Sequence, residues 1–335
     1  MEQRHPIYNT FSDYLKKRYG EKVYKLPIAL PVTCPNRDGS IASRGFASSG
    51  HEAACGGRGC TFCGSIGAGY ENLPADMTIT AQMEANKAHI VPKYKAKKFI
   101  PYFQNFSNTY TELDRLRSWV REAGQGDDIA AIYIATRPDC ISDEYLSMLR
   151  EEAARLNIDI CVELGLQSVN YHSLEKINRG HTLGEFIDAM IRIKAHGLQS
   201  CAHLILNLPW DTMTDVIEDA KVLSALGADQ VKLHALYIVK GTEMARQFAS
   251  GELAMINREE YEARVITFLE YLSPKIVLQR LIGRAPESNT LFSNWHTGWW
   301  KIRDSIIRTM EANGQHQGRC CDYLNGRAVR KFLSE

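Results

Sequence analysis

The amino-acid sequence predicts an α/β fold in which parallel strands alternate with helices. Short runs of apolar and β-branched residues recur along residues 1–240, separated by stretches whose apolar residues follow a helical period. Such alternation is typical of parallel strands joined by right-handed crossover connections. About six strand–helix units fit into this part, on the candidate strands Lys25–Val32, Phe99–Gln104, Ala130–Ala135, Asp159–Glu163, Cys201–Leu206 and Gln230–Leu233.

Three of the intervening segments carry the signals that begin and end a helix. Ser142–Leu156 starts with a residue able to cap the helix, has acidic residues in its first turn, and repeats apolar residues on one face. Leu183–His196 has the same pattern and is followed by Gly197, a residue type that commonly ends helices. Thr212–Leu226 repeats it before Gly227. We expect these helices to cover the strands.

The strand pattern allows either a doubly wound sheet or a barrel, complete or partial. No G-x-G-x-x-G turn follows the first strand, which argues against a dinucleotide-binding sheet. After residue 240 the alternation gives way to helices, a strand-like Lys275–Leu281 and a polar, aromatic tail. We therefore expect residues 1–240 to form the strand–helix domain and residues 241–335 to form an extension packed on it.

The composition restricts the possible partners. The 335 residues include 40 Lys and Arg against 39 Asp and Glu, which excludes a uniformly basic nucleic-acid coat but allows a local basic patch. Residues 1–18 hold several charges and lack the apolar core of a signal peptide. No apolar run reaches the length that spans a bilayer. We expect a cytoplasmic protein without membrane contact.

A cluster of cysteines points to a metal site. Cys60-Thr-Phe-Cys63 is a C-x2-C pair preceded by glycines, which let the backbone bend until both thiolates reach one metal centre. Clustered cysteines in a cytoplasmic chain favour metal binding or redox chemistry over a disulfide framework. By local spacing alone, a structural zinc and an iron–sulfur cluster are equally compatible with this set. The clustered cysteines are Cys34, Cys55, Cys60 and Cys63.

Further motifs follow in order along nearly the whole chain. They are Arg18-Tyr-Gly, Cys34-Pro-Asn-Arg-Asp-Gly39, Gly59-Cys-Thr-Phe-Cys63, Tyr102-Phe-Gln104, Ala135-Thr-Arg-Pro-Asp-Cys140, Val162-Glu-Leu-Gly-Leu-Gln-Ser168, Ile177-Asn-Arg-Gly-His181, Lys232-Leu-His234 and Lys240-Gly-Thr242. Together they resemble the radical S-adenosylmethionine (SAM) proteins related to the Elongator catalytic subunit, in the YhcC/YtqA group. The resemblance implies a partial (β/α)6 TIM-type radical SAM barrel with a C-terminal α+β extension.

The resemblance also implies a [4Fe–4S] cluster held by Cys34, Cys60 and Cys63. Three thiolates leave one iron open, to which SAM binds through its amino and carboxylate groups. An electron from the cluster then cleaves SAM to a 5′-deoxyadenosyl radical. The stretch between Cys34 and Cys60 is longer than is usual in the group, and Cys55 lies within the excess. We assign the third ligand to Cys34, because the residues after it match the family.

Other residues are expected by resemblance to contact SAM. Gln167 would bond the ribose or the amino-acid part, and Arg179 would hold the carboxylate with its planar guanidinium. Three of the expected contacts also have an ordinary structural alternative. The alternative is a packing aromatic for Phe62, a solvated charge for Arg179 and a hydrogen-bonded core side chain for His203. The expected cofactor contacts are Phe62, Thr136, Gln167, Arg179, His203 and Asn207.

The resemblance further implies a substrate and an electron donor. Elongator-type proteins modify wobble uridines, so we expect a tRNA whose 5-carboxymethylaminomethyl side chain is trimmed to aminomethyl. The donor would be a flavodoxin or a ferredoxin. Two alternatives remain open: radical SAM chemistry on a small metabolite or a protein, and a non-catalytic structural metal-binding protein. Candidate RNA contacts are the basic residues Lys93, Lys95, Lys97, Lys98, Arg319, Arg327, Arg330 and Lys331 and the aromatic residues Trp295, Trp299 and Trp300.

Overall fold

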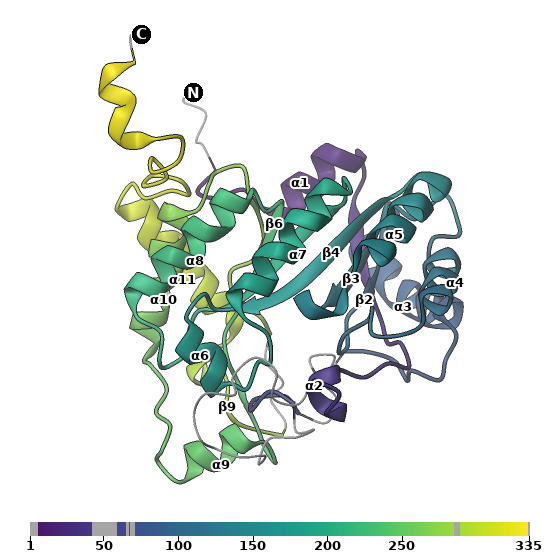
Figure 1. The fold of residues 1–335 in the computed structure, drawn as a ribbon, viewed down its shortest axis with the longest axis horizontal. Coiled ribbons are helices and arrows are strands. Elements are labelled where there is room, and N and C mark those ends of the chain that lie inside the picture. Colours follow the sequence, from purple (N-terminus) through teal and green to yellow (C-terminus); the bar gives the residue numbers. More distant parts are fainter. Residues whose placement is uncertain (1–5, 42–58, 65–66, 68–70, 285–288, 334–335) are drawn as a thin grey trace.

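The computed structural model describes residues 6–41, 59–64, 67, 71–284 and 289–333. Its main feature is a parallel sheet of seven strands in the order β1-β2-β3-β4-β5-β6-β8 (Figure 1). The outer strands of this order do not pair with each other in the described part of the chain, so the sheet forms an open half-barrel. The strands are β1 (Val23–Ile28), β2 (Lys98–Phe103), β3 (Ala131–Thr136), β4 (Asp159–Gln167), β5 (Gln199–Ile205), β6 (Gln230–His234) and β8 (Val277–Arg280).

Helices connect these strands, and a small second sheet lies beside them. In that sheet β7 (Ile238–Val239) pairs antiparallel with β9 (Thr290–Phe292). The helices are α1 (Phe11–Tyr19), α2 (Pro35–Asp38), α3 (Ile79–Tyr94), α4 (Leu113–Ala123), α5 (Asp143–Leu156), α6 (Tyr171–Lys176), α7 (Leu183–Ala195), α8 (Met213–Leu226), α9 (Glu243–Ala249), α10 (Arg258–Tyr271) and α11 (Trp299–Ala312), with 3-10 turns at Pro138–Cys140, Asn294–His296 and Arg327–Phe332. No described helix is long and apolar enough to cross a membrane.

The sheet has one strand more than the six expected. The strand-like Lys275–Leu281 contains β8, which pairs parallel with β6. Helix α10 provides the crossover between these two strands, and it packs on α8 with buried Val265, Phe268 and Leu269. The extension after residue 240 therefore completes the sheet as well as packing on it.

Apolar side chains lie on both faces of the sheet. Those on the outer face form the larger core with the surrounding helices. Inside the half-barrel, Ile100 and Tyr133 pack with Phe11, Tyr14 and Leu15 of α1, which closes the end where the strands begin. The candidate active site lies at the opposite end of the half-barrel, where the strands finish.

The three expected helices are confirmed as α5, α7 and α8, but one expected cap differs. Thr212 accepts from the backbone N–H of Asp215 at 3.5 Å, as an N-cap residue does. Ser142 makes no such bond, because its hydroxyl donates to the Glu144 carboxylate instead. Ser142 therefore begins α5 without capping it through its side chain.

Candidate active site

A cavity of about 690 Å³ opens where the parallel strands end. Active sites assemble at this end of β/α barrels because the loops after several strands converge there. The loop after β1 brings Cys34 to the cavity, and a later loop brings Cys60 and Cys63. Thr136 ends β3 and Gln167 ends β4, and both side chains line the same space.

Two of the three cysteine sulfurs, those of Cys60 and Cys63, lie near N–H donors. Cys34 precedes the one-turn helix α2, and both Cys34 and Cys60 are buried. The Asn36 amide lies 3.6 Å from the sulfur of Cys60, and an Arg37 nitrogen lies 3.7 Å from that of Cys63. Donors around the sulfur atoms stabilise thiolates and tune a cluster bound to them.

The loop that carries Cys60 and Cys63 is held by the segment after α6. The Thr61 N–H donates to the Ile177 carbonyl at 3.0 Å, and the Asn178 amide donates to the Gly59 carbonyl at 2.8 Å. Gly59 has a φ of +73°, and a side chain there would come within 2.9 Å of Arg37. The Ile177-Asn-Arg-Gly-His181 motif thus fixes the cysteine loop as well as presenting Arg179.

Cys34, Cys60 and Cys63 line the cavity together, and their sulfur atoms are the candidate ligands of a metal centre. Burial, with repulsion from Cys60, raises the pKa of the Cys63 thiol to about 11. A Cys63 thiolate in this place therefore needs nearby positive charge, such as a metal supplies. Cys55 lies outside the described residues.

Most of the expected SAM contacts meet in this cavity. Phe62, Thr136, Gln167, Arg179 and His203 line it together with the cysteines. Asn207 does not belong to the lining residues. Its buried amide instead donates to the Leu236 carbonyl at 3.2 Å and accepts from the Leu236 N–H, which fixes the turn after β6.

Arg179 and Gln167 approach each other across a glycine. The Arg179 guanidinium donates to the Gly165 carbonyl at 2.7 Å and lies 3.6 Å from the Cys60 sulfur. A Cβ on Gly165 would lie 2.6 Å from the Arg179 guanidinium and 2.8 Å from the Gln167 amide. The pairing of β4 with β5 shifts between Gly165 and Gln167, and Gln167 has a φ of +81°. The end of β4 is therefore shaped to bring these two side chains together.

A charged network fills the barrel below the cysteines, centred on the fully buried Glu163. One carboxylate oxygen accepts from Lys25 at 2.7 Å and from Gln279 at 2.8 Å. The other accepts from His203 at 2.8 Å and from Lys232 at 3.4 Å. The neighbouring cations hold the pKa of Glu163 well below its usual range against the opposing effect of burial. Glu163 is therefore an ionised acceptor with four donors.

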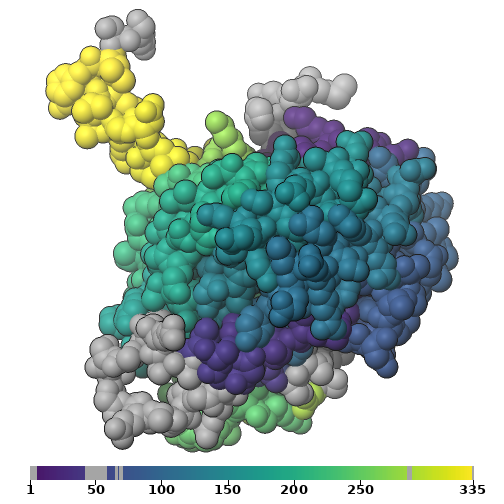
Figure 2. Space-filling model, turned by 45° about the vertical axis from the view of Figure 1, so that its right-hand side comes forward, coloured from purple at the N-terminus to yellow at the C-terminus, as the bar shows by residue number. Residues whose placement is uncertain are grey.

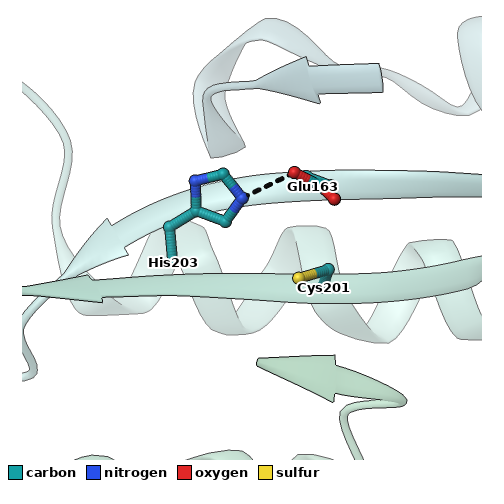
Figure 3. A group of neighbouring side chains, drawn as sticks. All are labelled: Glu163, Cys201 and His203. Carbon is teal, nitrogen blue, oxygen red and sulfur yellow. Dashed lines mark hydrogen bonds and ion pairs between the residues drawn. The ribbon is translucent and has the colours of Figure 1, made fainter. Parts of the chain in front are cut away.

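Figure 3 shows Glu163, Cys201 and His203, whose ligand atoms lie within 4.8 Å of one another. This spacing alone suits a metal ion. The carboxylate oxygens, however, are already bonded to two lysines, whose charge repels a cation. Burial lowers the pKa of His203 to about 4, so its ring is neutral and donates to Glu163. The expected alternative for His203, a hydrogen-bonded core side chain, describes its contacts in the structure.

Tyr102, Lys232 and Arg280 line the cavity but received no site role from the sequence, although Tyr102 and Lys232 lie in motifs that resemble the family. Lys232 donates to the Tyr102 hydroxyl at 2.8 Å, and Arg280 donates to the Nδ1 atom of His234 at 2.7 Å. The sequence signal for such interior residues is a single charged residue inside an otherwise apolar strand, as at Lys25 and Lys232. In a half-barrel such a residue faces the interior, and it needs a partner there.

Comparisons with known proteins show the family of this chain. The model of the Radical SAM superfamily matches residues 53–223, and that of the Radical_SAM C-terminal domain matches residues 228–312. YtqA of Bacillus subtilis is 32% identical over 313 residues, which is 93% of this chain and 92% of that protein. The chain belongs to the radical SAM superfamily.

Within the radical SAM superfamily the protein belongs to the YhcC/YtqA group and is an enzyme. A tRNA uridine(34) acetyltransferase of Methanocaldococcus jannaschii is 32% identical over 161 residues, 46% of this chain and 28% of that protein. The fold is similar to that of the archaeal Methanocaldococcus infernus Elp3, with a TM-score of 0.64, 16% identity, and coverage of 88% of this chain and 64% of that one. The expected half-barrel is thereby confirmed.

Proposed function

We propose that this radical SAM enzyme holds a [4Fe–4S] cluster on Cys34, Cys60 and Cys63 and binds SAM beside it. The observation that carries the proposal is the shared cavity: the three cysteines line it together with Gln167 and Arg179. Membership of the radical SAM superfamily favours an iron–sulfur cluster over one zinc ion at these cysteines. Three ligands match a cluster that keeps one iron free for SAM.

The protein's own side chains then have separate roles. Arg179 would grip the SAM carboxylate with the nitrogens that now approach the Cys60 sulfur and the Gly165 carbonyl. Gln167 would offer its amide to the ribose or the amino-acid part, and Phe62 would border the adenine. The bound cofactors supply a 5′-deoxyadenosyl radical that removes a hydrogen atom from the substrate.

We expect Arg179→Ala to weaken SAM binding roughly ten- to hundredfold, because it removes a charge-assisted bond in a partly dry pocket. Equilibrium binding of SAM to anaerobically reconstituted protein measures this. Arg150→Ala, which removes an exposed arginine of α5, should bind SAM like the wild type. Unchanged affinity in Arg179→Ala, at full iron content, would remove Arg179 from the SAM site.

For the substrate we propose a tRNA wobble uridine with a 5-carboxymethylaminomethyl side chain, trimmed to aminomethyl. The carboxymethyl group would leave as glyoxylate, with SAM as the two-electron oxidant, cleaved to methionine and 5′-deoxyadenosine, and with water supplying the aldehyde oxygen. The support is the relative that acts on tRNA uridine 34, which shares 161 aligned residues with this chain. The open side of the half-barrel also suits a large substrate that delivers one base, and an anticodon base is already unpaired. A flavodoxin or ferredoxin would supply the electron.

The basic residues selected from the sequence do not lie at the mouth of the cavity. Lys97 and Lys98 lie where β2 begins, and the C-terminal segment extends from the same end of the barrel, away from α2 and α9 (Figures 1 and 2). Arg319 and Arg327 also pair with Glu270 and Asp322. These residues give the RNA proposal no support at the cavity.

The tryptophans of the extension separate into packing and exposed residues. Trp295 donates its ring N–H to the Ile256 carbonyl at 2.7 Å and contacts Tyr261 and Phe292, so it packs the extension. Trp300 is 50% exposed. Trp299 is partly buried against the core and its ring packs edge-on against Trp300, so Trp300 is the most accessible of the three rings for stacking on a base.

The substrate test supplies bulk tRNA to reduced enzyme and SAM without oxygen. We expect the carboxymethylaminomethyl nucleoside to decrease, the aminomethyl nucleoside to increase, and 5′-deoxyadenosine to form in equal amount, as read by mass spectrometry. Cys60→Ala protein serves as the inactive control. If the nucleosides stay unchanged while a small-molecule extract stimulates SAM cleavage, the substrate is a metabolite and the RNA proposal is wrong.

A further inference from the structure

A row of cationic and imidazole side chains crosses the wall formed by β5, β6 and β8. In the strand register His203 is the partner of Lys232, and Lys232 is the partner of Arg280. The register shifts beside Lys232, so that both Gln279 and Arg280 turn into the barrel. The row lies on a different wall of the cavity from Arg179, which follows β4.

The acidic charge near this row is already shared. Glu163 pairs with both Lys25 and Lys232, so this carboxylate is already shared between two lysines. Burial lowers the pKa of Lys232 to about 7 against the attraction of Glu163, and Lys25 and Arg280 lower it further. One carboxylate thus faces more positive charge than it neutralises.

Arg280 is the cation of this row without an ion pair: within the described residues no carboxylate lies within ion-pair distance of its guanidinium. Its hydrogen bonds go to the Leu233 carbonyl at 3.2 Å and to the ring of His234, whose Nδ1 atom must be unprotonated to accept. Burial lowers the pKa of His234 well below its usual range, so this neighbour is neutral.

Burying an arginine in a cavity without a counter-ion is unfavourable because the charge loses its hydration. A bound anion offsets this loss. The planar fork of Arg280 fits the two oxygens of a carboxylate, and Lys232 adds a second positive group beside it. Both side chains line the cavity that also contains the three cysteines. An anionic substrate group held there would place the adjoining carbons inside the reaction space.

We propose that Arg280, with Lys232, binds a carboxylate of the substrate and so selects substrates that carry one. This inference rests on the proposed function, in which the carboxylate is that of the carboxymethylaminomethyl side chain. Arg280 and Lys232 would then position this side chain from its far end, while the uridine remains toward the mouth of the cavity.

The test compares two anticodon stem-loop RNAs that differ in one group. One carries 5-carboxymethylaminomethyluridine, and the other carries its primary amide, which has nearly the same shape without the charge. Binding is measured by fluorescence anisotropy on reconstituted, SAM-bound, unreduced enzyme, so that no turnover occurs. We expect the wild type to bind the carboxylate RNA about tenfold more tightly, as one charge-assisted contact predicts.

Variants assign that preference to Arg280. Arg280→Gln should abolish it, Arg280→Lys should retain part of it, and Arg308→Gln, a change at an exposed residue of α11, should leave it intact. Iron content and SAM affinity should stay at wild-type levels in all three. If Arg280→Gln weakens both RNAs equally, the arginine contacts a phosphate, and the carboxylate assignment is wrong. If it weakens SAM instead, the site belongs to the cofactor, which also overturns it.

A small probe separates failure of this site from failure of the RNA proposal. N-ethylglycine carries the same amino-carboxylate end as the side chain, and N-ethylglycinamide is its neutral counterpart. Preference for N-ethylglycine in ligand-observed NMR, lost in Arg280→Gln and partly kept in Arg280→Lys, supports the carboxylate site even if no tRNA is modified. Trimmed tRNA together with an unchanged preference in Arg280→Gln overturns the site and leaves the function standing.

Discussion

Alanine at Cys34, Cys60 or Cys63 should remove most of the bound iron from anaerobically purified protein. Each change deletes one of three thiolates that converge on the cavity, and two thiolates do not hold a cubane cluster firmly. Iron and sulfide analysis with the visible absorption spectrum measures the loss. Reduced protein of each variant should also fail to produce 5′-deoxyadenosine.

Two other cysteine changes are the matched controls. Cys320→Ala alters a partly exposed thiol beyond α11 and should keep full iron content. Cys55→Ala should keep most of the iron as well, since the family motif follows Cys34. A Cys55→Ala protein without iron, beside a Cys34→Ala protein with it, would reverse the ligand assignment. A wild-type protein that is colourless and contains zinc would instead support the alternative of a structural metal-binding protein.

Glu163→Gln should lower the free energy of unfolding by about 3 kcal/mol near neutral pH. The change keeps the shape of the side chain but leaves Lys25 and Lys232 as buried cations without an ion-pair partner. Urea unfolding of the two proteins measures the difference. A loss below about 1 kcal/mol would mean that the network contributes little to the fold.

Glu152→Gln offers a control with the same chemistry in another setting. The Glu152 carboxylate is equally buried, but its partners Arg121 and Arg155 are about half exposed and stay hydrated when the pair is lost. The expected cost is about 1 kcal/mol or less. A smaller loss of stability in Glu152→Gln than in Glu163→Gln would show that the larger effect at Glu163 comes from the desolvation of its two lysines.

The Glu163 effect should depend on pH in one direction. Its pKa is lower in the folded protein, so its stabilisation is complete above the unfolded-state pKa of roughly 4.3 and is lost as the pH falls toward the folded-state pKa. The stability difference between wild type and Glu163→Gln should therefore shrink as the pH falls below that value. A difference that stays constant from pH 7 into this acid range would rule out the ionised carboxylate as its cause.

The strands show which parts of the sheet the sequence patterns predicted and which they missed. Apolar runs located β1 to β6, because strands covered on both faces are apolar for most of their length. The same runs gave no sign that β8, of four residues, joins the sheet beside β6. Short strands carry little periodic signal, and the pairing partner of a strand is set by the crossover helix that precedes it, here α10.

Local patterns in the sequence determined the parallel strand–helix class and the cysteine candidates for a metal site. The resemblance of its motifs to a known family implied the half-barrel, the superfamily and the residues expected around the cysteines. Only the tertiary structure decided that Asn207 supports a turn, that the basic tail lies away from the cavity, and that Arg280 makes no ion pair with a carboxylate of the residues that the structure describes. The physical reason is that charge balance and burial are sums over neighbours from distant strands, and such neighbours become known only when the chain has folded.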